Sequence, residues 1–185
     1  MSKRSNFERR ERDFYPTPFK AVPPLARHLT RGTSFDEPCA GNGALIDHLE
    51  SLGFLCRFSS DIEPQHSGIS KFNALDINER MADCFITNPP WPMPSQKGEP
   101  VISLIIHLSD VAPTWLLLPA DFKHNLYFSK VENRCRKIQS IGRVKWIPDT
   151  KNSGKDNCAW YLFDKPNKRP TQFFGRLPKE GHHDD

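Results

Sequence analysis

The sequence predicts an α/β fold with one domain and a mostly parallel sheet that closes with an antiparallel hairpin. Short apolar runs alternate with helical segments along most of the chain. Acidic or amide residues directly follow several of these runs, as they do at the carboxyl ends of strands in open α/β sheets. The last two apolar runs, 141–147 and 158–163, are joined by a polar, glycine-containing segment, which favours an antiparallel pair.

The amino-terminal half predicts several strands and one clear helix. A short strand that begins near Thr33 runs into a glycine loop, and a helix follows from Ala44 to about Leu52. The apolar segments that come next are 54–60, 74–77 and 84–87. Parallel strands usually need a crossover of about a dozen residues or more, with a helix inside. The short spacing therefore predicts reduced helices, with residues 65–70 as a loop.

The carboxyl-terminal half continues the same alternation. It predicts an apolar helix over 101–108, a strand over 114–118 and a helix that contains residues 125–131, followed by the closing hairpin. The tail from Lys165 is rich in proline and is expected to be largely irregular.

Composition agrees with one folded domain, which we expect over residues 13–165, between a basic segment at 1–12 and an irregular tail at 166–185. Of the 185 residues, 37% are hydrophobic and 26% charged, which suits a folded core. No apolar run has the length of a membrane span, and the charged start lacks the apolar centre of a secretory signal. The five cysteines are scattered without a Cys-x-x-Cys pair, so we expect no disulfide framework, no metal site and a cytoplasmic location.

An amide, two prolines and an aromatic ring follow the apolar run 84–87, at an expected strand end. The Asn88 carboxamide oxygen and the Pro89 carbonyl can accept two hydrogen bonds from one aromatic amine. Two acceptors favour the pyramidal, nucleophilic amine of a transition state. Pro89 and Pro90 restrict the backbone, and Trp91 offers a face on which a base can stack. Asn-Pro and Pro-Pro are also ordinary loop signals, so the alternative is a plain strand-ending loop.

A glycine loop between the first strand and the first helix is a second candidate ligand site. Gly41 and Gly43 permit close approach of the backbone and positive φ. Ile46 stands where a dinucleotide fingerprint has its third glycine, which disfavours a pyrophosphate site. Asp61 ends the next strand about 20 residues later, the spacing of an acid that binds a ribose diol. The alternative for Asp61 is a turn residue before Pro64.

Taken in order, these motifs resemble the adenine-specific DNA methyltransferases that use S-adenosylmethionine. Five segments carry the resemblance: Phe14-Tyr15-Pro16-Thr17-Pro18, the glycine loop from Glu37 to Leu45, Asp61-Ile62-Glu63-Pro64, Asp76-Ile77 and Asn88-Pro89-Pro90-Trp91. The resemblance implies a Rossmann-like class I methyltransferase sheet in a small enzyme of the bacterial or phage type, as found in restriction-modification.

The resemblance also implies the site. S-adenosylmethionine is the implied cofactor, and an adenine flipped out of duplex DNA is the implied substrate. Catalysis is assigned to Asn88, Pro89, Pro90 and Trp91. Cofactor contacts are assigned to Tyr15, Thr17, Pro18, Pro38, Cys39, Ala40, Gly41, Gly43, Asp61, Ile62, Asp76, Ile77 and Asn88. Since the segment between Asp76 and the catalytic strand is short, we expect the cofactor's adenine to be covered less than in larger relatives.

The formal net charge of +4 is compatible with binding to nucleic acid. One basic group, formed by Lys123, Lys130, Arg134 and Lys137, is predicted to contact phosphates, and the alternative is a solvated face. No stretch remains for a separate target-recognition domain. We therefore expect a short or relaxed target, or a partner that supplies specificity.

Two alternatives to DNA methylation stay open. The Asn-Pro-Pro-aromatic motif also occurs in enzymes that methylate bases in RNA or glutamine amides in proteins, so either is an alternative substrate. A non-catalytic protein that binds the cofactor and acts through contact with other proteins is the alternative from another class. The intact Asn88 motif argues against it, because a pure binding protein has no need for that arrangement.

Overall fold

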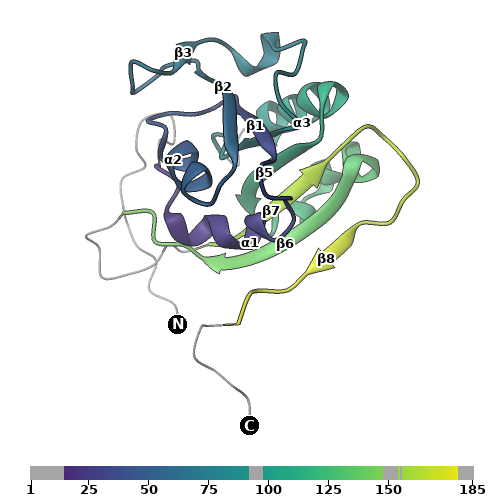
Figure 1. Ribbon diagram of the computed structural model, residues 1–185. Helices are drawn as coiled ribbons and strands as arrows, with labels where there is room; N and C mark the ends of the chain where they lie inside the picture. Colours follow the sequence, from purple (N-terminus) through teal and green to yellow (C-terminus); the bar gives the residue numbers. More distant parts are fainter. Residues whose placement is uncertain (1–14, 92–97, 148–153, 155, 179–185) are drawn as a thin grey trace.

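Eight strands form one sheet in the computed structural model, which describes residues 15–91, 98–147, 154 and 156–178 (Figure 1). The strands are β1 (Ser34–Glu37), β2 (Leu55–Asp61), β3 (Ser70–Lys71), β4 (Cys84–Thr87), β5 (Thr114–Pro119), β6 (Cys135–Arg143), β7 (Asn157–Phe163) and β8 (Gln172–Phe174). Their order across the sheet is β3-β2-β1-β4-β5-β7-β6-β8. All neighbours pair in parallel except β5 with β7 and β6 with β7. The predicted sheet with its antiparallel closing pair is confirmed.

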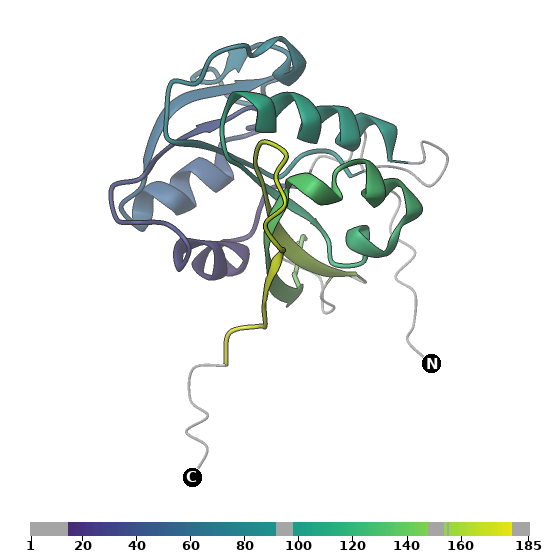
Figure 2. The ribbon, with the colours of Figure 1, turned by 90° about the vertical axis from the view of Figure 1, so that its right-hand side faces the viewer.

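Helices cover both faces of this sheet, with α1 and α2 on one face and α3 on the other (Figure 2). The helices are η2 (Phe19–Ala21), α1 (Val22–Ala26), α2 (Ala44–Ser51), η3 (Ala74–Asp76), α3 (Glu99–Val111), η5 (Phe122–His124), η6 (Leu126–Lys130) and η7 (Glu132–Arg134), where η marks a 3-10 helix. Among the described residues, no helix has both the length and the apolar character needed to cross a bilayer.

The core follows the alternation of side chains along β5. Trp115 and Leu117 pack with the residues of α1 and α2, whereas Leu116 and Leu118 pack with those of α3. Successive side chains of a strand point to opposite faces, so a continuous apolar run is buried on both. This strand was predicted from that run, and it forms the centre of the sheet.

The connection from β2 to β4 contains no α-helix, as its length predicted. Residues 65–69 form a loop, and Ser70 begins the two-residue β3. The apolar segment at 74–77 differs from the expected strand pattern because it forms η3. The Asn73 side chain accepts a hydrogen bond from the backbone nitrogen of Leu75 at 3.1 Å and so caps this turn.

The first strand of the closing hairpin was predicted at 141–147, but β6 begins six residues earlier, at Cys135. Arg136, Lys137 and Gln139 lie inside it and interrupt the apolar pattern that would predict a strand here. The strand belongs to both cores, because Ile138 packs on the α3 side and Ile141 on the α1 side.

The helix expected over residues 125–131 is replaced by the short η6, which lies between η5 and η7. Asn125 separates η5 from η6 with an extended backbone (φ −80°, ψ 142°). Its side-chain amide donates to the backbone oxygens of Asp121 and Phe122, at 3.1 and 3.2 Å. This local bonding competes with a continuous helix.

The tail was expected to be largely irregular, yet residues 172–174 form β8, which pairs in parallel with β6 (Figure 1). Side chains hold this strand in place. The Gln139 amide nitrogen donates to the Gly175 carbonyl at 2.7 Å, and the Thr171 hydroxyl donates to the Cys135 carbonyl at 2.9 Å. Gln139 is itself buried, and its amide oxygen lies 2.8 Å from Nε2 of His28.

Candidate active site

The carboxyl ends of three adjacent parallel strands meet at one edge of the sheet. β1 lies between β2 and β4 and is parallel to both. The glycine loop therefore follows β1 at the same edge where Asp61 ends β2 and Asn88 follows β4. Ligands of open α/β sheets bind in this position.

Asp61 links the glycine loop to the end of β2. One carboxylate oxygen accepts a hydrogen bond from the Gly41 backbone nitrogen at 2.9 Å, and the other accepts from the Glu63 backbone nitrogen at 2.8 Å. Gly41 and Gly43 have φ of 55° and 85°, a region that favours glycine. Gly43 then begins α2 as its N-cap residue. Each Asp61 oxygen keeps acceptor capacity for a further donor, because a carboxylate oxygen can accept more than one hydrogen bond.

Glu37 is a further candidate site residue, which the sequence motifs did not indicate. It ends β1, directly before the glycine loop, and its side chain is buried. Burial, and then the nearby charge of Asp61, raise the pKa of the Glu37 carboxyl well above its usual value. Its Oε2 atom has no hydrogen-bond partner among the described residues. Its position could have indicated a site residue, because Glu37 ends β1 just as Asp61 ends β2.

The remaining loop residues are packed rather than reactive. Pro38 and Ala40 are buried, and the Ala40 backbone nitrogen donates to the Ser60 carbonyl at 2.9 Å. Burial, followed by the charge of Asp61, raises the pKa of the Cys39 thiol to about 12. The Cys39 thiol is therefore protonated at neutral pH and is a poor nucleophile.

Asn88 is half-buried and faces the amino-terminal segment. Its amide nitrogen donates a long hydrogen bond to the backbone oxygen of Tyr15 at 3.4 Å. This contact uses the donor end of the carboxamide and leaves its oxygen as the end that can accept from a ligand. Pro89 is buried and Pro90 is exposed. In the segment that follows Tyr15, Thr17 is buried, and Pro18 is half-buried at the start of η2.

Three aromatic rings from separate segments lie close to one another near the end of β4. The Trp91 indole nitrogen donates to the Leu117 carbonyl at 3.0 Å, so the ring is fixed against β5. Trp146 meets Trp91 edge to face, with ring centroids 5.4 Å apart, and lies 6.4 Å from the Tyr15 ring. Trp146 was not predicted as a site residue, because the apolar run 141–147 predicts a strand at this position, whereas β6 ends at Arg143.

The predicted adenine-side contacts divide into two kinds. The Ile62 side chain is 58% exposed at the end of β2, and Asp76 is exposed at the end of η3, so both can meet a ligand. Ile77 does not fit the prediction of a side-chain contact. It is buried against Leu104 and Leu108 of α3, and its backbone oxygen lies 2.8 Å from Nε2 of His107.

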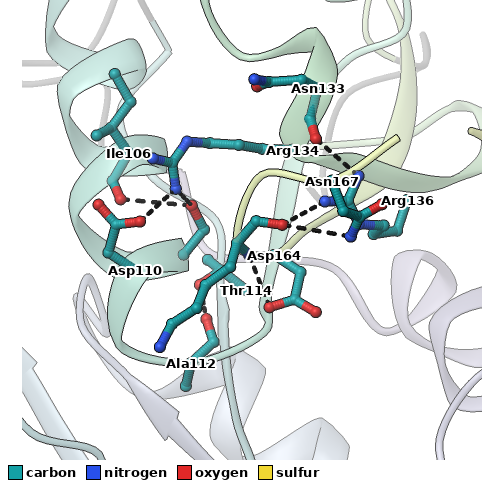
Figure 3. A network of polar contacts seen from close by, with 11 residues as sticks. Ile106, Asp110, Ala112, Thr114, Asn133, Arg134, Arg136, Asp164 and Asn167 are labelled. Carbon is teal, nitrogen blue, oxygen red and sulfur yellow. Dashed lines mark hydrogen bonds and ion pairs between the residues drawn. The ribbon is translucent and has the colours of Figure 1, made fainter. Parts of the chain in front are cut away.

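Arg134 does not fit the predicted phosphate contact, because it is buried and paired. Its guanidinium donates to the Ser109 hydroxyl at 2.9 Å and to the Asp110 carboxylate at 2.6 Å (Figure 3). This contact ties η7 to the end of α3.

The other three cations of the predicted group are spread over separate elements. Lys130 forms an exposed ion pair with Glu99 at 2.5 Å, and the Lys123 ammonium lies 4.6 Å from the centre of the Phe173 ring. Lys137 is half-buried in β6, in register with Gln172 of β8.

No family model matches the chain, and no curated protein matches it in sequence. Its structure is similar to that of a chain of a type I restriction-modification system, with 15% identity and a TM-score of 0.54 over 95% of this chain and 47% of that one. A modification subunit assigned to a type I restriction enzyme of Vibrio vulnificus gives 13% identity and a TM-score of 0.54, over 91% of this chain and 48% of that one. The chain thus spans about half the length of these two relatives.

A protein assigned as an RNA methyltransferase, from Pyrococcus horikoshii, gives 18% identity and a TM-score of 0.51. That similarity covers 83% of this chain and 87% of the other. At these identities the comparisons establish the fold. Together with the strand order, they show that the chain has the Rossmann-like fold of the class I methyltransferases.

Proposed function

We propose that the protein is an S-adenosylmethionine-dependent methyltransferase that methylates the exocyclic amine of adenine in DNA. The observation that carries the proposal is the orientation of Asn88. Its amide nitrogen donates to the Tyr15 carbonyl, so its oxygen is the end that can accept from a ligand, and it precedes Trp91 by three residues at the edge that holds the glycine loop. The similarity, over about half their length, to a chain of a type I restriction-modification system and to a modification subunit of a type I restriction enzyme supports a DNA substrate.

The residues at the carboxyl ends of β1 and β2 fit the cofactor. Asp61 would accept the ribose hydroxyls, and the Gly41 and Gly43 backbone would lie beside the methionine part. Glu37 is a buried carboxyl whose Oε2 lacks a partner among the described residues, and a cationic group of a ligand would stabilise its charged form. When bound, S-adenosylmethionine supplies the electrophilic methyl group.

Asn88 and Pro89 would prepare the amine that accepts this methyl group. The Asn88 oxygen and the Pro89 carbonyl would each accept one N–H of the adenine amine. As the new N–C bond forms, the nitrogen lone pair is localised and the N–H groups become more acidic. Both hydrogen bonds therefore strengthen in the transition state, which is the condition for catalysis. The bond between that methyl group and sulfur would break as the N–C bond forms, with its electron pair left on sulfur, and the methylated nitrogen would then lose one proton to solvent to give a neutral product.

The aromatic rings would receive a base that has left the helix. An adenine amine inside a duplex cannot reach a site at the sheet edge, so the base must be flipped out or single-stranded. Trp91 would stack on it, and Trp146 stands perpendicular to Trp91 and would line the same space.

Transfer of labelled methyl groups tests this function. The purified protein is incubated with methyl-labelled S-adenosylmethionine and with DNA, RNA or protein, and the modified polymer is hydrolysed to nucleosides or amino acids. We expect label in N6-methyl-2′-deoxyadenosine from DNA, and far less of it with Asn88→Ala. Label in RNA adenine or in glutamine would redirect the substrate assignment. Cofactor binding without transfer to any acceptor would support the non-catalytic alternative.

A further inference from the structure

Gly154 lies against the Trp146 indole, with no side chain between its backbone and the ring. A Cβ atom added to Gly154 would stand 2.8 Å from Cδ1 of Trp146 and 3.1 Å from its Nε1. Real Cβ atoms essentially never approach another heavy atom within 3.0 Å, so an alanine could enter only if the ring or the backbone moved. The contact between this backbone and the indole therefore depends on glycine.

A backbone hydrogen bond fixes Gly154 in this place. Its nitrogen donates to the Val144 carbonyl at 2.7 Å, and Val144 is buried in the core beside α1 and α2. A Cβ atom at position 154 would also lie 2.7 Å from that carbonyl oxygen. The φ angle of Gly154 lies outside the positive range that favours glycine. Close approach, and not backbone conformation, is therefore the reason for glycine at this position.

Trp146 in turn meets aromatic rings of two other segments. Its centroid lies 5.4 Å from that of Trp91 with an interplanar angle of 89°, and 6.4 Å from that of Tyr15 with an angle of 58°. The Tyr15 carbonyl accepts the hydrogen bond from the Asn88 amide nitrogen. The orientation of Trp146 therefore bears both on the ring that follows Asn88 and on the residue that orients its carboxamide.

The two indoles are held in different ways. Trp91 is fixed by the hydrogen bond from its own nitrogen to the Leu117 carbonyl. Trp146 is half-buried and lies three residues beyond the end of β6, where pairing with a neighbouring strand no longer constrains it. A side chain in such a position can change rotamer unless its neighbours prevent it. The backbone of Gly154 is such a neighbour, because it packs directly on the indole.

We infer that Gly154 is a positioning residue of the proposed base site, and that its backbone holds the Trp146 ring perpendicular to Trp91. The inference rests on the proposed function, because it takes Trp91 and Trp146 as the walls of the space that receives the base. A side chain at position 154 would displace the Trp146 indole and change its distance and angle to Trp91. The space beside Trp91 would then no longer match a flat base, since stacking depends on ring geometry.

Circular dichroism tests the positioning in the protein without substrate. Two indoles in edge-to-face contact couple their electronic transitions and give two bands of opposite sign in the far ultraviolet. Trp146→Phe removes one indole and so identifies the signal of this pair. Gly154→Ala should reduce that signal by about half or more, because it changes the geometry of the pair. The matched control is Gly175→Ala, which adds a methyl group where nothing lies within 4 Å and should leave the signal unchanged.

Binding of single-stranded oligonucleotides tests the consequence for the base. The ratio of the affinities for oligo-dA and for an abasic oligomer of the same length separates base contacts from phosphate contacts. The wild-type protein should prefer oligo-dA by about tenfold, and Gly154→Ala should lower this ratio by about threefold or more. In a Trp146→Ala background, Gly154→Ala should have no further effect on the ratio, because the substitution acts through the indole. Calorimetric titration should give Gly154→Ala the cofactor affinity of the wild type.

An unchanged indole signal in Gly154→Ala would overturn the inference, as would an unchanged oligo-dA ratio beside a reduced signal. An equal effect of Gly154→Ala in the Trp146→Ala background would also overturn it, because the effect would then come from the Val144 carbonyl. A wild-type protein with no preference for oligo-dA would refute the base site itself, and the indole signal would separately report whether Gly154 orients Trp146.

Thermal unfolding of each variant verifies the fold. If Gly154→Ala failed to fold and Gly154→Ala/Trp146→Ala folded, the contact with the indole would be the cause, which supports the inference. Failure of both variants to fold would make Gly154 a structural residue and overturn it.

Discussion

The amide nitrogen of Asn88 and the backbone carbonyl oxygen of Tyr15 lie 3.4 Å apart, joining the residue after β4 to the segment before η2. These residues are 73 positions apart in the chain, so only the fold brings them together. The contact orients a carboxamide that could otherwise rotate by half a turn about its last bond. It therefore determines which atom of Asn88 faces an incoming amine.

Asn88→Ala should lower turnover by about two orders of magnitude or more, as for loss of one transition-state acceptor. Cofactor affinity should remain largely intact. The turnover of Asn88→Asp should lie between those of the wild type and Asn88→Ala, because the aspartate keeps an acceptor oxygen but cannot donate to the Tyr15 carbonyl. Single-turnover rates at saturating cofactor measure this. Normal turnover of Asn88→Ala at saturating cofactor would contradict the catalytic role of Asn88.

Asp61→Ala should weaken S-adenosylmethionine binding by about tenfold or more, because a carboxylate–hydroxyl hydrogen bond contributes roughly 1.5–3 kcal/mol. The same change removes the acceptor of the Gly41 backbone nitrogen, so Asp61→Asn is the milder companion variant. Calorimetric titration gives both affinities. Unchanged affinity in a folded Asp61→Ala protein would contradict the ribose assignment.

Glu37→Gln should stabilise the free protein at neutral pH and weaken cofactor binding. The pKa of Glu37 is raised in the folded state, so that state binds its proton more tightly than the unfolded chain does. The resulting contribution to stability is fully present below the unfolded pKa and is lost as pH rises through the folded pKa. Thermal unfolding from pH 4 to 8 should therefore show a smaller decline for the variant. If the stability of Glu37→Gln and of the wild type changed with pH in the same way, the buried Glu37 carboxyl would not be the cause of the decline.

Trp91→Phe should be mild, whereas Trp91→Ala should reduce both affinity for DNA and rate, since stacking contributes roughly 1–3 kcal/mol per base. A 2-aminopurine at the target position reports flipping by its fluorescence. Because Trp91 can quench a stacked base, the probe should brighten more with Trp91→Ala. No change with either protein would count against base flipping.

Substitution of Arg134 should affect mainly stability, whereas substitution of Lys123 and Lys137 should affect mainly DNA binding. Arg134→Ala should cost about 2 kcal/mol of unfolding free energy, through loss of a buried hydrogen bond to Ser109 and a partly buried one to Asp110. Lys123→Gln with Lys137→Gln should leave stability nearly unchanged and lower the salt slope of DNA affinity by about 2 if each contacts one phosphate. Binding titrations across salt concentrations, beside denaturant unfolding, distinguish the two effects. An unaltered slope would remove both lysines from the interface.

The central strands and helices could be predicted because their sequences are simple. β4 and β5 are apolar runs buried on both faces, and α3 carries the apolar residues expected at 101–108. The first six residues of β6 could not, because Arg136 and Lys137 interrupt its pattern while neighbouring strands still supply its hydrogen bonds. Local propensity is weaker than such tertiary pairing.

The candidate site shows the same division. Motif order placed Asp61, Asn88 and the glycine loop, since strand ends meet at one edge whatever lies between them. Trp146 and the burial of Arg134 depend on contacts between distant segments, which spacing along the chain does not encode. Asp110, the partner of Arg134, is 24 residues away and on another element.

The short strand β8 also has a protective consequence. It covers the outer side of β6, a nine-residue strand, over the register from Lys137 to Gln139. Without it, those backbone groups would form an open template for pairing between molecules. A chain that stops at residue 165 should therefore keep the ends of β1, β2 and β4 intact and yet tend to aggregate. On this view the last strand preserves solubility and takes no part in chemistry.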